Sequence, residues 1–592
     1  MAKNKITEIG EIDSISGNTI SVRLFDNIKS NMPIIDGIVY RIGQISSFVK
    51  VPLGYATLYG IVTQIGSSAI PDNLKEVYLF DYEKIQNTRW INIVLVGEQI
   101  GNKFERGVIQ FPSTGDKVHL VTIKDLNILY GGYDDYNSIT IGNISVSESL
   151  DAKIDLDKMI SRHTAIVGST GSGKSNAVSI LLQAIAKRKF KSSRIVVIDP
   201  HGEYNESLSD FSSLIEISSE AENKLVIPFW ALPFNELIKI FSGNLSDQNR
   251  EYIREKVVDA KVQSVEKNKI EVPIESITAD SPIPFSIKRL WYELDDFERL
   301  TLQSDRNTPT AKIEVGDVET LKSNIYPPAG IGNAAPFVNM RAKGILSFLD
   351  SMRNKLGNAS YSFLFYPGDL TPDTEGKIEQ DLDHLFQLWL GGDKPITILD
   401  LSGVPSEIMS SISGTLLKII YDGLFWGINT KVGGKQQPLL IVLEEAHNYL
   451  KAGEDSISSR TVQTIAKEGR KYGVGLLLAT QRPSEIDETV LSQCGTLIAL
   501  RMNNSKDRSH IRSAIQDELQ TMIDLLPSLR TGEALISGEA VKIPSRVKFY
   551  KANQNVKGSD PKASDLWTKE ISNKDEEYKK LVKSWRNQNY KI

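Results

Sequence analysis

With 592 residues the chain is too long for one compact domain, and its 40% hydrophobic and 24% charged residues are ordinary for a soluble globular protein. A single cysteine, Cys494, excludes an intramolecular disulfide and a cysteine-cluster metal site, and we expect it to be a small buried core residue. The net charge of −5 gives no support to a globally basic nucleic-acid binder, so any DNA site must be local, such as a pore or a groove. No apolar run is long enough to span a membrane and no signal-peptide pattern opens the chain, so we expect a cytoplasmic protein without a membrane anchor.

Residues 1–145 are predicted to form a small β-barrel. Ile20, Val22 and Leu24 alternate with polar residues, which is the period of a half-buried strand. Turn residues such as Asp36-Gly37 and Gly115-Asp116 separate further strand candidates at 44–51, 57–65, 90–97 and 117–123. Many short strands with no helix between them favour a barrel.

Strand and helix patterns alternate after the barrel, which is typical of an α/β fold with a mostly parallel sheet. Strands are expected at 163–168 and 194–199, with a helix at 173–188 between them. The alternation stops near residue 230, and strand candidates return at 395–401, 438–443, 474–480 and 496–501. We therefore predict one α/β core in two parts, residues 146–232 and 391–555.

A mostly helical insertion at 233–390 is predicted to interrupt this core. Its amphipathic stretches lie at 234–242, 246–264 and 337–355. The chain ends in a charged, helical extension at 556–592, which Trp567 and Trp585 are expected to dock.

Residues 168–175 match the Walker A pattern GxxxxGK[ST] at every fixed position, between an apolar strand and a helix. Glycines let such a loop wrap its backbone N–H groups around phosphate oxygens, and the helix N-terminus adds its positive end. We expect Lys174 to reach the β- and γ-phosphates of ATP and the Ser175 hydroxyl to bind Mg²⁺. A glycine-rich turn without a ligand is the alternative. The predicted ATP-binding residues are Gly168, Ser169, Thr170, Gly171, Ser172, Gly173, Lys174, Ser175 and Asn176.

Carboxylates follow two apolar strands, at the sheet edge where ligands of α/β proteins bind. Glu444 and Glu445 follow the strand at 439–443; Glu444 is expected to hold Mg²⁺ through water, and Glu445 to polarise the attacking water. Asp199 follows the strand at 195–198, and it is either a second metal-shell residue or the cap of a turn.

Two further polar positions are candidates for catalysis. Thr480 and Gln481 end the strand candidate at 474–480, where they are expected either to sense the γ-phosphate or to cap the strand end. Arg470 closes a helix, where it is either an arginine finger for a neighbouring subunit or a cation favourably placed at a helix C-terminus.

The sequence resembles the HerA group of the HerA/FtsK superfamily, hexameric ATPases that pump double-stranded DNA. The similarity covers most of the chain and is carried by 162–168 with the Walker A motif, 199–204, 443–449, 467–473 and 479–483. The N-terminal region resembles the family's HAS barrel, with Phe104, Gly107, Pro112 and Gly115 in the expected order. Two features depart from the commonest pattern: Glu444 stands where an aspartate often holds the metal, and the insertion is long.

The resemblance implies a RecA-like P-loop core in a ring of six subunits, with Arg470 acting in trans and Arg162 as a second inter-subunit arginine. It also implies ATP-driven translocation of double-stranded DNA, with ATP and Mg²⁺ as cofactors. Nothing in the sequence looks like an effector site, so a separately encoded nuclease or sirtuin-like NADase is expected to dock on the barrel, residues 1–145. Antiviral defence is then the expected role, with DNA end resection as the alternative.

Three other functions are alternatives to the translocase. One is a ring-shaped scaffold in which ATP binding controls a partner enzyme. Another is a DExH-type helicase, prompted by residues 444–447, which fares worse because no second core with an arginine motif is visible. A small-molecule kinase would need neither the barrel nor Arg470.

Overall fold

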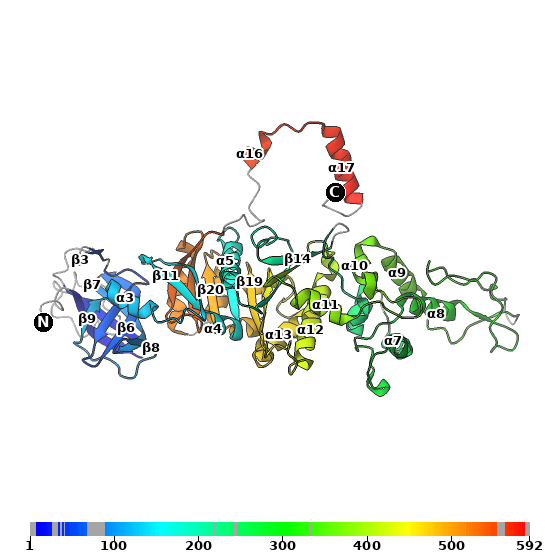
Figure 1. Ribbon diagram of the computed structural model, residues 1–592, viewed down its shortest axis with the longest axis horizontal. Coiled ribbons are helices and arrows are strands. Elements are labelled where there is room, and N and C mark those ends of the chain that lie inside the picture. Colours follow the sequence, from blue (N-terminus) through cyan, green and yellow to red (C-terminus); the bar gives the residue numbers. More distant parts are fainter. Residues whose placement is uncertain are drawn as a thin grey trace.

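The structure is a computed structural model that describes residues 7–25, 33–35, 38–40, 42–67, 89–145, 147–217, 221–241, 245–331, 334–514, 517–552 and 563–586. A barrel, an α/β core and an insertion of helices and loops follow one another along the long axis (Figure 1). The predicted fold class, a P-loop α/β core with a helical insertion behind an N-terminal barrel, is confirmed. The predicted turn at Asp36-Gly37 lies outside the described residues.

The N-terminal sheet closes into a barrel because two strands from its opposite ends pair with each other. The order is β2 (Thr19–Leu24), β1 (Glu8–Ser16), β9 (Lys117–Leu120), β5 (Phe48–Pro52), β6 (Ala56–Ser67) and β7 (Arg89–Ile100), after which β7 pairs with β2. The short strand β8 (Lys103–Arg106) forms a hairpin with β7, and helix α3 (Ile123–Tyr130) follows the barrel strands. A separate ribbon joins β3 (Ile34–Ile35) to β4 (Ile38–Val39). Ile20, Val22 and Leu24 are buried inside the barrel, as their alternation predicts.

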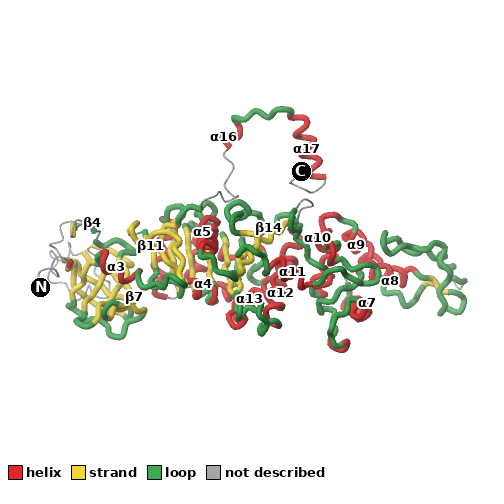
Figure 2. Tube along the Cα trace, viewed as in Figure 1, coloured by secondary structure: helices red, strands yellow, loops and turns green. Residues whose placement is uncertain are grey.

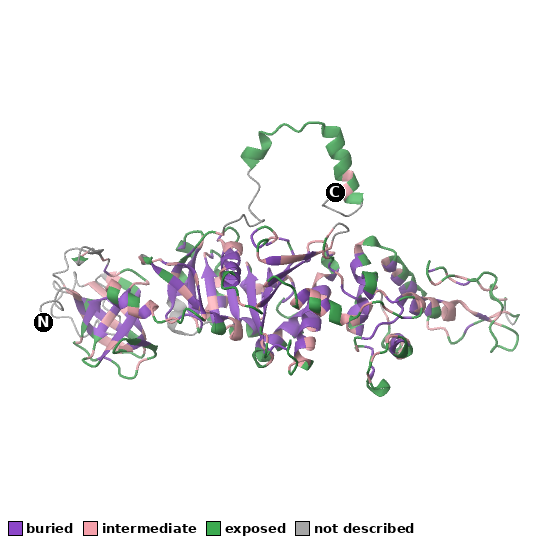
Figure 3. Cartoon of the chain, viewed as in Figure 1, coloured by how far each residue is buried: buried purple, intermediate pink, exposed green. Residues whose placement is uncertain are grey.

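The core is one sheet whose parallel part carries seven strands. In order these are β20 (Thr496–Leu500), β12 (Thr164–Val167), β19 (Val474–Thr480), β18 (Leu439–Leu443), β13 (Arg194–Asp199), β17 (Ile396–Asp400) and β14 (Ser212–Glu216). Alternate residues of β18 face two different apolar clusters, one with helix α5 (Lys174–Lys187) and one with helices α12 (Met409–Trp426) and α13 (Ile457–Glu468). The strands read as continuous apolar runs because both faces are covered, as the burial colours show (Figure 3).

Beyond β20 the sheet turns antiparallel, which the sequence analysis did not predict. The added strands are β21 (Glu533–Gly538), β22 (Ser545–Phe549), β10 (Ser138–Ile144) and β11 (Ser147–Asp155). The predicted domain boundary at residue 145 therefore differs from the sheet assignment: β10 pairs with β11 and β22 in the core sheet and not with the barrel strands. Short helices α4 (Leu156–Ser161), α14 (Glu488–Ser492) and α15 (Ser505–Ala514) complete the core.

The insertion combines helices with long loops (Figure 2), so helices cover less of it than the sequence predicts. Its helices are α6 (Phe234–Phe241), α7 (Asp247–Lys267), α8 (Ile287–Arg299), α9 (Leu346–Leu356), α10 (Ser362–Phe365) and α11 (Leu382–Leu390), with the strand pair β15 (Thr301–Leu302) and β16 (Phe337–Val338). The helix predicted at 337–355 begins only at Leu346, because Phe337 and Val338 pair with β15 and Gly344 adopts a left-handed φ of 73°.

The C-terminal helices α16 (Ala563–Trp567) and α17 (Lys574–Arg586) lie apart from the row of domains (Figure 1). Trp567 and Trp585 are 87% and 77% exposed, so they do not dock the extension on the described part of this chain. Within the described ranges, none of the helices combines the length and the apolar character that crossing a membrane requires.

Candidate nucleotide-hydrolysing site

The residues predicted to bind and hydrolyse ATP within one chain lie at the carboxyl ends of adjacent strands. The Walker A loop leaves β12, Gln481 follows β19, and Glu444 and Glu445 follow β18, in the order in which these strands lie in the sheet. Val167 is level with Thr480 and Leu443 with Leu478, so the three strands end within two residues of one another. Because such an edge is where α/β sheets bind ligands, the topology alone gathers the site.

The Walker A loop has the shape of a phosphate cradle. Gly173, the N-cap of α5, has a left-handed φ of 101°, and a Cβ there would lie 3.1 Å from the Gly532 nitrogen. In the part of the chain that the structure describes, the N–H groups of Gly171, Gly173 and Lys174 donate to no backbone acceptor. These donors, with the positive end of α5, are free to bind phosphate oxygens.

Lys174 lies buried between the two glutamates of the β18 edge. Its Nζ forms an ion pair with Glu444 and lies 3.2 Å from Glu445 Oε1. Burial opposes the charge on Lys174, but the two carboxylates outweigh it and raise the pKa of the ammonium. Burial raises the pKa of Glu444, and its ion pair with Lys174 offsets only part of that effect. The ammonium therefore stays protonated at the centre of the site.

Glu444 is held on both sides by tyrosines. The Tyr204 hydroxyl donates to its carboxylate, and the Tyr449 hydroxyl donates to its backbone carbonyl. The side chain is completely buried. These contacts fix the Glu444 carboxylate against the Lys174 ammonium.

Glu445 has the properties of a group that orients water. Burial alone would raise its pKa, but His447, Lys174 and Gln481 together lower the pKa of Glu445 to about 2. The His447 Nδ1 lies 3.1 Å from Glu445 Oε2, and the Gln481 side-chain amide donates to Oε1. Glu445 also has a left-handed φ of 46°, a strained conformation that functional sites often retain. The carboxylate is thus ionised and available as a hydrogen-bond acceptor.

Gln481 connects this carboxylate to the phosphate cradle. While its amide nitrogen donates to Glu445, its amide oxygen accepts from the Thr170 hydroxyl of the Walker A loop. The arrangement is that expected of a residue that senses the γ-phosphate. Thr480 instead lies beside His447, whose Nδ1 is 3.2 Å from the Thr480 hydroxyl.

The region around Ser175 differs from the predicted metal set. The Ser175 hydroxyl donates to Glu203 Oε2 at 2.7 Å, and sequence reasoning assigned no role to Glu203. Asp199 accepts the N–H groups of His201, Gly202 and Tyr204 at 2.9–3.1 Å. This is the turn-capping alternative for Asp199, and it holds the loop that carries Glu203 and Tyr204.

The donors present fit a magnesium ion bound with its nucleotide. Among the described residues, no group of three or more His, Cys, Asp and Glu side chains is placed to hold a metal ion. Mg²⁺ in phosphate-transfer sites needs no such group, because it keeps several waters and binds one or two protein oxygens plus substrate phosphates. The Ser175 hydroxyl beside Glu203 supplies such oxygens at the start of α5. Glu444 remains a prediction as a water-mediated ligand.

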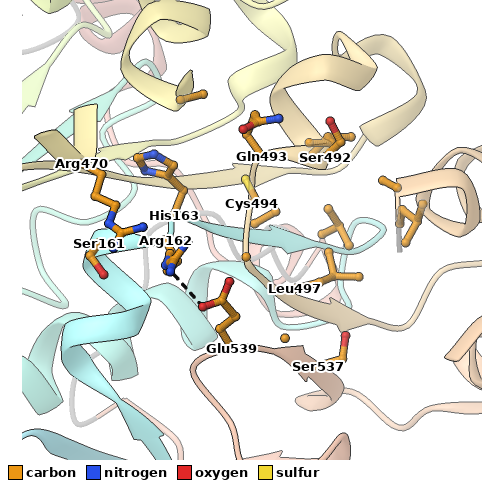
Figure 4. Close-up of a pocket in the computed structure, with 18 of the residues that line it drawn as sticks. Ser161, Arg162, His163, Arg470, Ser492, Gln493, Cys494, Leu497, Ser537 and Glu539 are labelled. Atoms are coloured by element: carbon orange, nitrogen blue, oxygen red, sulfur yellow. Dashed lines mark ion pairs between the residues drawn. The ribbon is translucent and has the colours of Figure 1, made fainter. Parts of the chain in front are cut away.

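Arg162 and Arg470 lie at the opposite edge of the same sheet. Arg162 immediately precedes the β12 region, and Arg470, in the turn Gly469–Tyr472, precedes β19. Both line a cavity of about 430 Å³, drawn in Figure 4. We call it the arginine cavity; its charged lining residues among those described are Arg106, Arg162, Lys467, Arg470 and Glu539. Because the strands run between this edge and the Walker A loop, neither arginine lies at its own chain's phosphate cradle.

Two further residues of the arginine cavity are structural. Burial lowers the pKa of His163 to about 4, and its Nδ1 accepts the Leu476 N–H at 3.0 Å. Burial raises the pKa of the Cys494 thiol to about 12, so the thiol stays protonated and unreactive. Arg162 Nε pairs with Glu539 Oε2 at 3.3 Å, the contact dashed in Figure 4.

Comparison with known proteins finds similar sequences and structures. The family model described as "Helicase HerA, central domain" matches residues 139–420, and "Helicase HerA-like C-terminal" matches 396–552. The chain is 25% identical to the DNA double-strand break repair helicase HerA of Sulfolobus acidocaldarius, over 86% of this chain and 89% of that protein. It is 29% identical to the probable DNA double-strand break repair helicase HerA of Methanocaldococcus jannaschii, over 76% and 83%. Among solved structures, VirB4 of Thermoanaerobacter pseudethanolicus is 15% identical, with a TM-score of 0.46 over 72% of this chain and 99% of that one.

Two substitutions separate nucleotide binding from hydrolysis at this site. Lys174→Ala is expected to lose ATP affinity and turnover together, because it removes the charge that faces the phosphates. Glu445→Gln is expected to keep ATP affinity while kcat falls by about 10²–10⁴, because only the orientation of water is lost. Nucleotide affinity and kcat of the full chain measure both effects, with exposed Glu454→Gln as the matched control. Near-normal turnover of Glu445→Gln would move the catalytic carboxylate to Glu444 or Asp199.

The Asp199 turn makes stability depend on pH. Burial, aided by Glu444 and Asp400, raises the pKa of Asp199 to about 7 although the N–H groups of Tyr204 and His201 oppose the shift. A raised folded pKa means that the folded chain binds the proton more tightly, so this stabilisation is complete below about pH 4 and is lost as pH rises through 7. Asp199→Asn mimics the neutral carboxyl, so its Tm should fall less than that of the parent between about pH 5 and 8. Parallel Tm curves for the two proteins would contradict the assignment.

Proposed function

Because the chain belongs to the HerA helicase family, we propose that it is an ATP-driven motor that moves double-stranded DNA as a ring of six subunits. The two family models together span residues 139–552, and the chain is an ATPase of this type. The relatives that are named DNA double-strand break repair helicases support DNA as the polymer on which it acts.

The positions of two arginines support the proposed ring. Arg162 and Arg470 lie at the amino edge of the strands, whereas Lys174 and Glu445 lie at the carboxyl edge. An arginine that stabilises the transition state must reach the transferred phosphoryl group, which these two side chains cannot do within one chain. A ring resolves this, because the arginine cavity of one subunit then faces the nucleotide of the next.

Hydrolysis then divides between two subunits. The Walker A N–H groups and Lys174 hold the phosphates, and Glu445 accepts a hydrogen bond from the attacking water and orients it. Gln481, which contacts both Glu445 and Thr170, connects the position of the γ-phosphate to that water. Arg470 of the neighbour neutralises charge on the transferred group. Mg²⁺, held near Ser175, supplies further neutralisation of the phosphate charge when it is bound.

We further propose that the motor works with a separately encoded nuclease or sirtuin-like NADase in antiviral defence, with DNA end resection as the alternative role. The barrel is the proposed docking surface, and its exposed apolar side chains support this choice. Tyr55, Ile109 and Phe111 are 62%, 81% and 47% exposed, and the Tyr55 hydroxyl donates to Gln110, which joins the two loops. We call these three residues the barrel patch.

DNA-dependent turnover tests the motor. Double-stranded DNA of unrelated sequences is expected to raise the ATPase rate equally, because a sliding motor contacts phosphates and not base edges. Affinity should fall by about 10³–10⁵ between 50 and 200 mM salt if 6–10 phosphates are contacted. Binding that resists salt or requires one defined site would contradict the proposal. An ATPase insensitive to DNA but stimulated by a partner enzyme would favour the ATP-regulated scaffold.

Point substitutions test the docking surface better than removal of the barrel. Deleting residues 1–145 would also remove β10 from the core sheet, whereas Ile109→Asp with Phe111→Asp changes only exposed side chains. The variant is expected to keep its ring and its basal ATPase rate but to lose co-purification with the product of the neighbouring gene. Exposed Tyr136→Asp, outside the barrel strands, is the control. A partner retained by the double variant would place docking elsewhere, with the extension at 563–586 next.

A further inference from the structure

The arginine cavity is built by two domains. Arg162 and Arg470 belong to the core, but Arg106 comes from the barrel strand β8. Arg106 and Glu539 also line a neighbouring hollow with Tyr133 and Lys542, so Arg106 stands at the junction of barrel and core.

The direction of Arg106 follows from its strand. Alternate residues of a strand share one side, so Arg106 points to the same side as Phe104. Phe104 is buried, packs edge-on against Tyr59 at 6.0 Å between ring centroids, and belongs to the same apolar cluster as the core strands. Lys103 and Glu105 lie on the other side, where they pair with each other at 2.8 Å. Both cations are exposed, but Arg106 lies on the side of the strand that faces the junction with the core, and Lys103 lies on the other side.

The charge in the arginine cavity favours an anionic partner. Among the described lining residues, four of the five charged side chains are cations and one, Glu539, is a carboxylate, so the lining carries a net positive charge. Like charges gathered around a partly enclosed space repel each other, and a polyanion relieves that repulsion. A nucleotide triphosphate carried by a neighbouring subunit has this charge.

We propose that Arg106 is a third inter-subunit arginine, which the barrel of one subunit supplies beside Arg162 and Arg470 to the phosphates of the nucleotide bound by the next. The inference rests on the proposed ring. It has a consequence for control: because Arg106 belongs to the barrel, any partner that shifts the barrel also shifts a cation at the neighbour's nucleotide. The barrel patch and the rate of ATP hydrolysis are thereby connected.

Kinetics of the full-length ring with ATP test the proposal. Arg106→Ala is expected to lower kcat about tenfold with KM nearly unchanged, less than the 10³–10⁵ of a direct arginine finger because Arg106 is exposed to water. Lys103→Ala, on the other side of β8, is the matched control and should not change kcat. Arg106→Lys should recover part of the loss, because it keeps the charge without the guanidinium fork. Equal kcat for Arg106→Ala and Lys103→Ala would overturn the inference.

Mixed rings distinguish action on the neighbour from a structural role. Arg106→Ala subunits keep Glu445 and Glu445→Gln subunits keep Arg106, so a mixed ring contains complete interfaces that neither variant has alone. Activity several-fold above the unmixed sum is expected, and its absence would overturn the inference. Arg106→Gln replaces the alanine variant in this experiment if the latter fails to assemble. Mixed rings of Arg470→Ala and Glu445→Gln subunits test the proposed ring itself. Restored ATPase activity in these rings, without restored activity in the Arg106→Ala mixture, would reject only the role of Arg106 and leave the ring in place.

Discussion

The structure depends on one buried cluster of charge, the Lys174 ammonium held between Glu444 and Glu445. Three ionised or ionisable groups out of water are stable only when each is paired and hydrogen-bonded, since the cost of desolvating a lone charge is several kcal/mol. Here Tyr204 and Gln481 supply the remaining hydrogen bonds to the two carboxylates. The cluster therefore requires β12, β18 and β19 to end close together, and the parallel register of the sheet ends them within two residues of one another.

The same strands also separate the two halves of the chemistry. A parallel strand carries its carboxyl end to one edge and its amino end to the other, so the loops that follow β12 and β19 lie at one edge while the residues before these strands, Arg162 and Arg470, lie at the opposite edge. One chain thus offers a nucleotide cradle on one edge and a cationic cavity on the opposite edge. In the proposed ring, a repeated head-to-tail contact between identical subunits would join the two, because such a contact closes into a ring when its rotation allows.

The barrel is not a separate attachment to this core. Phe48, Tyr59 and Phe104 of the barrel bury their rings in the apolar cluster that also contains α5 and the core strands. The barrel and the helix that follows the Walker A loop therefore share one apolar cluster. Its outward side, which carries the barrel patch, remains exposed. In the proposed assembly, the barrel therefore supplies both the docking surface and Arg106 of the arginine cavity.

The sequence by itself determined what depends on neighbours along the chain. Residues 168–175 specify the phosphate cradle because glycine spacing, an apolar strand and a helix start are all local. Apolar runs such as 439–443 specify buried strands, and the polar residues that end them, Glu444, Glu445 and Gln481, mark the sheet edge. The closed barrel followed in the same way from the alternation of short strands.

Only the tertiary structure decided which distant residues meet. Ser175 contacts Glu203, and Tyr204 contacts Glu444 across 240 positions of the chain, contacts that no local pattern encodes. The oxygens of the Asp199 carboxylate accept hydrogen bonds from the N–H groups of its own turn. Its position after a strand was equally compatible with a role in binding a metal. The sequence also did not predict the antiparallel edge of the core sheet, where β10 pairs with β22. Pairing partners depend on register across the sheet and not on the propensity of each strand. For the same reason Arg106, an ordinary exposed residue of a short strand, reaches the arginine cavity only once barrel and core pack together.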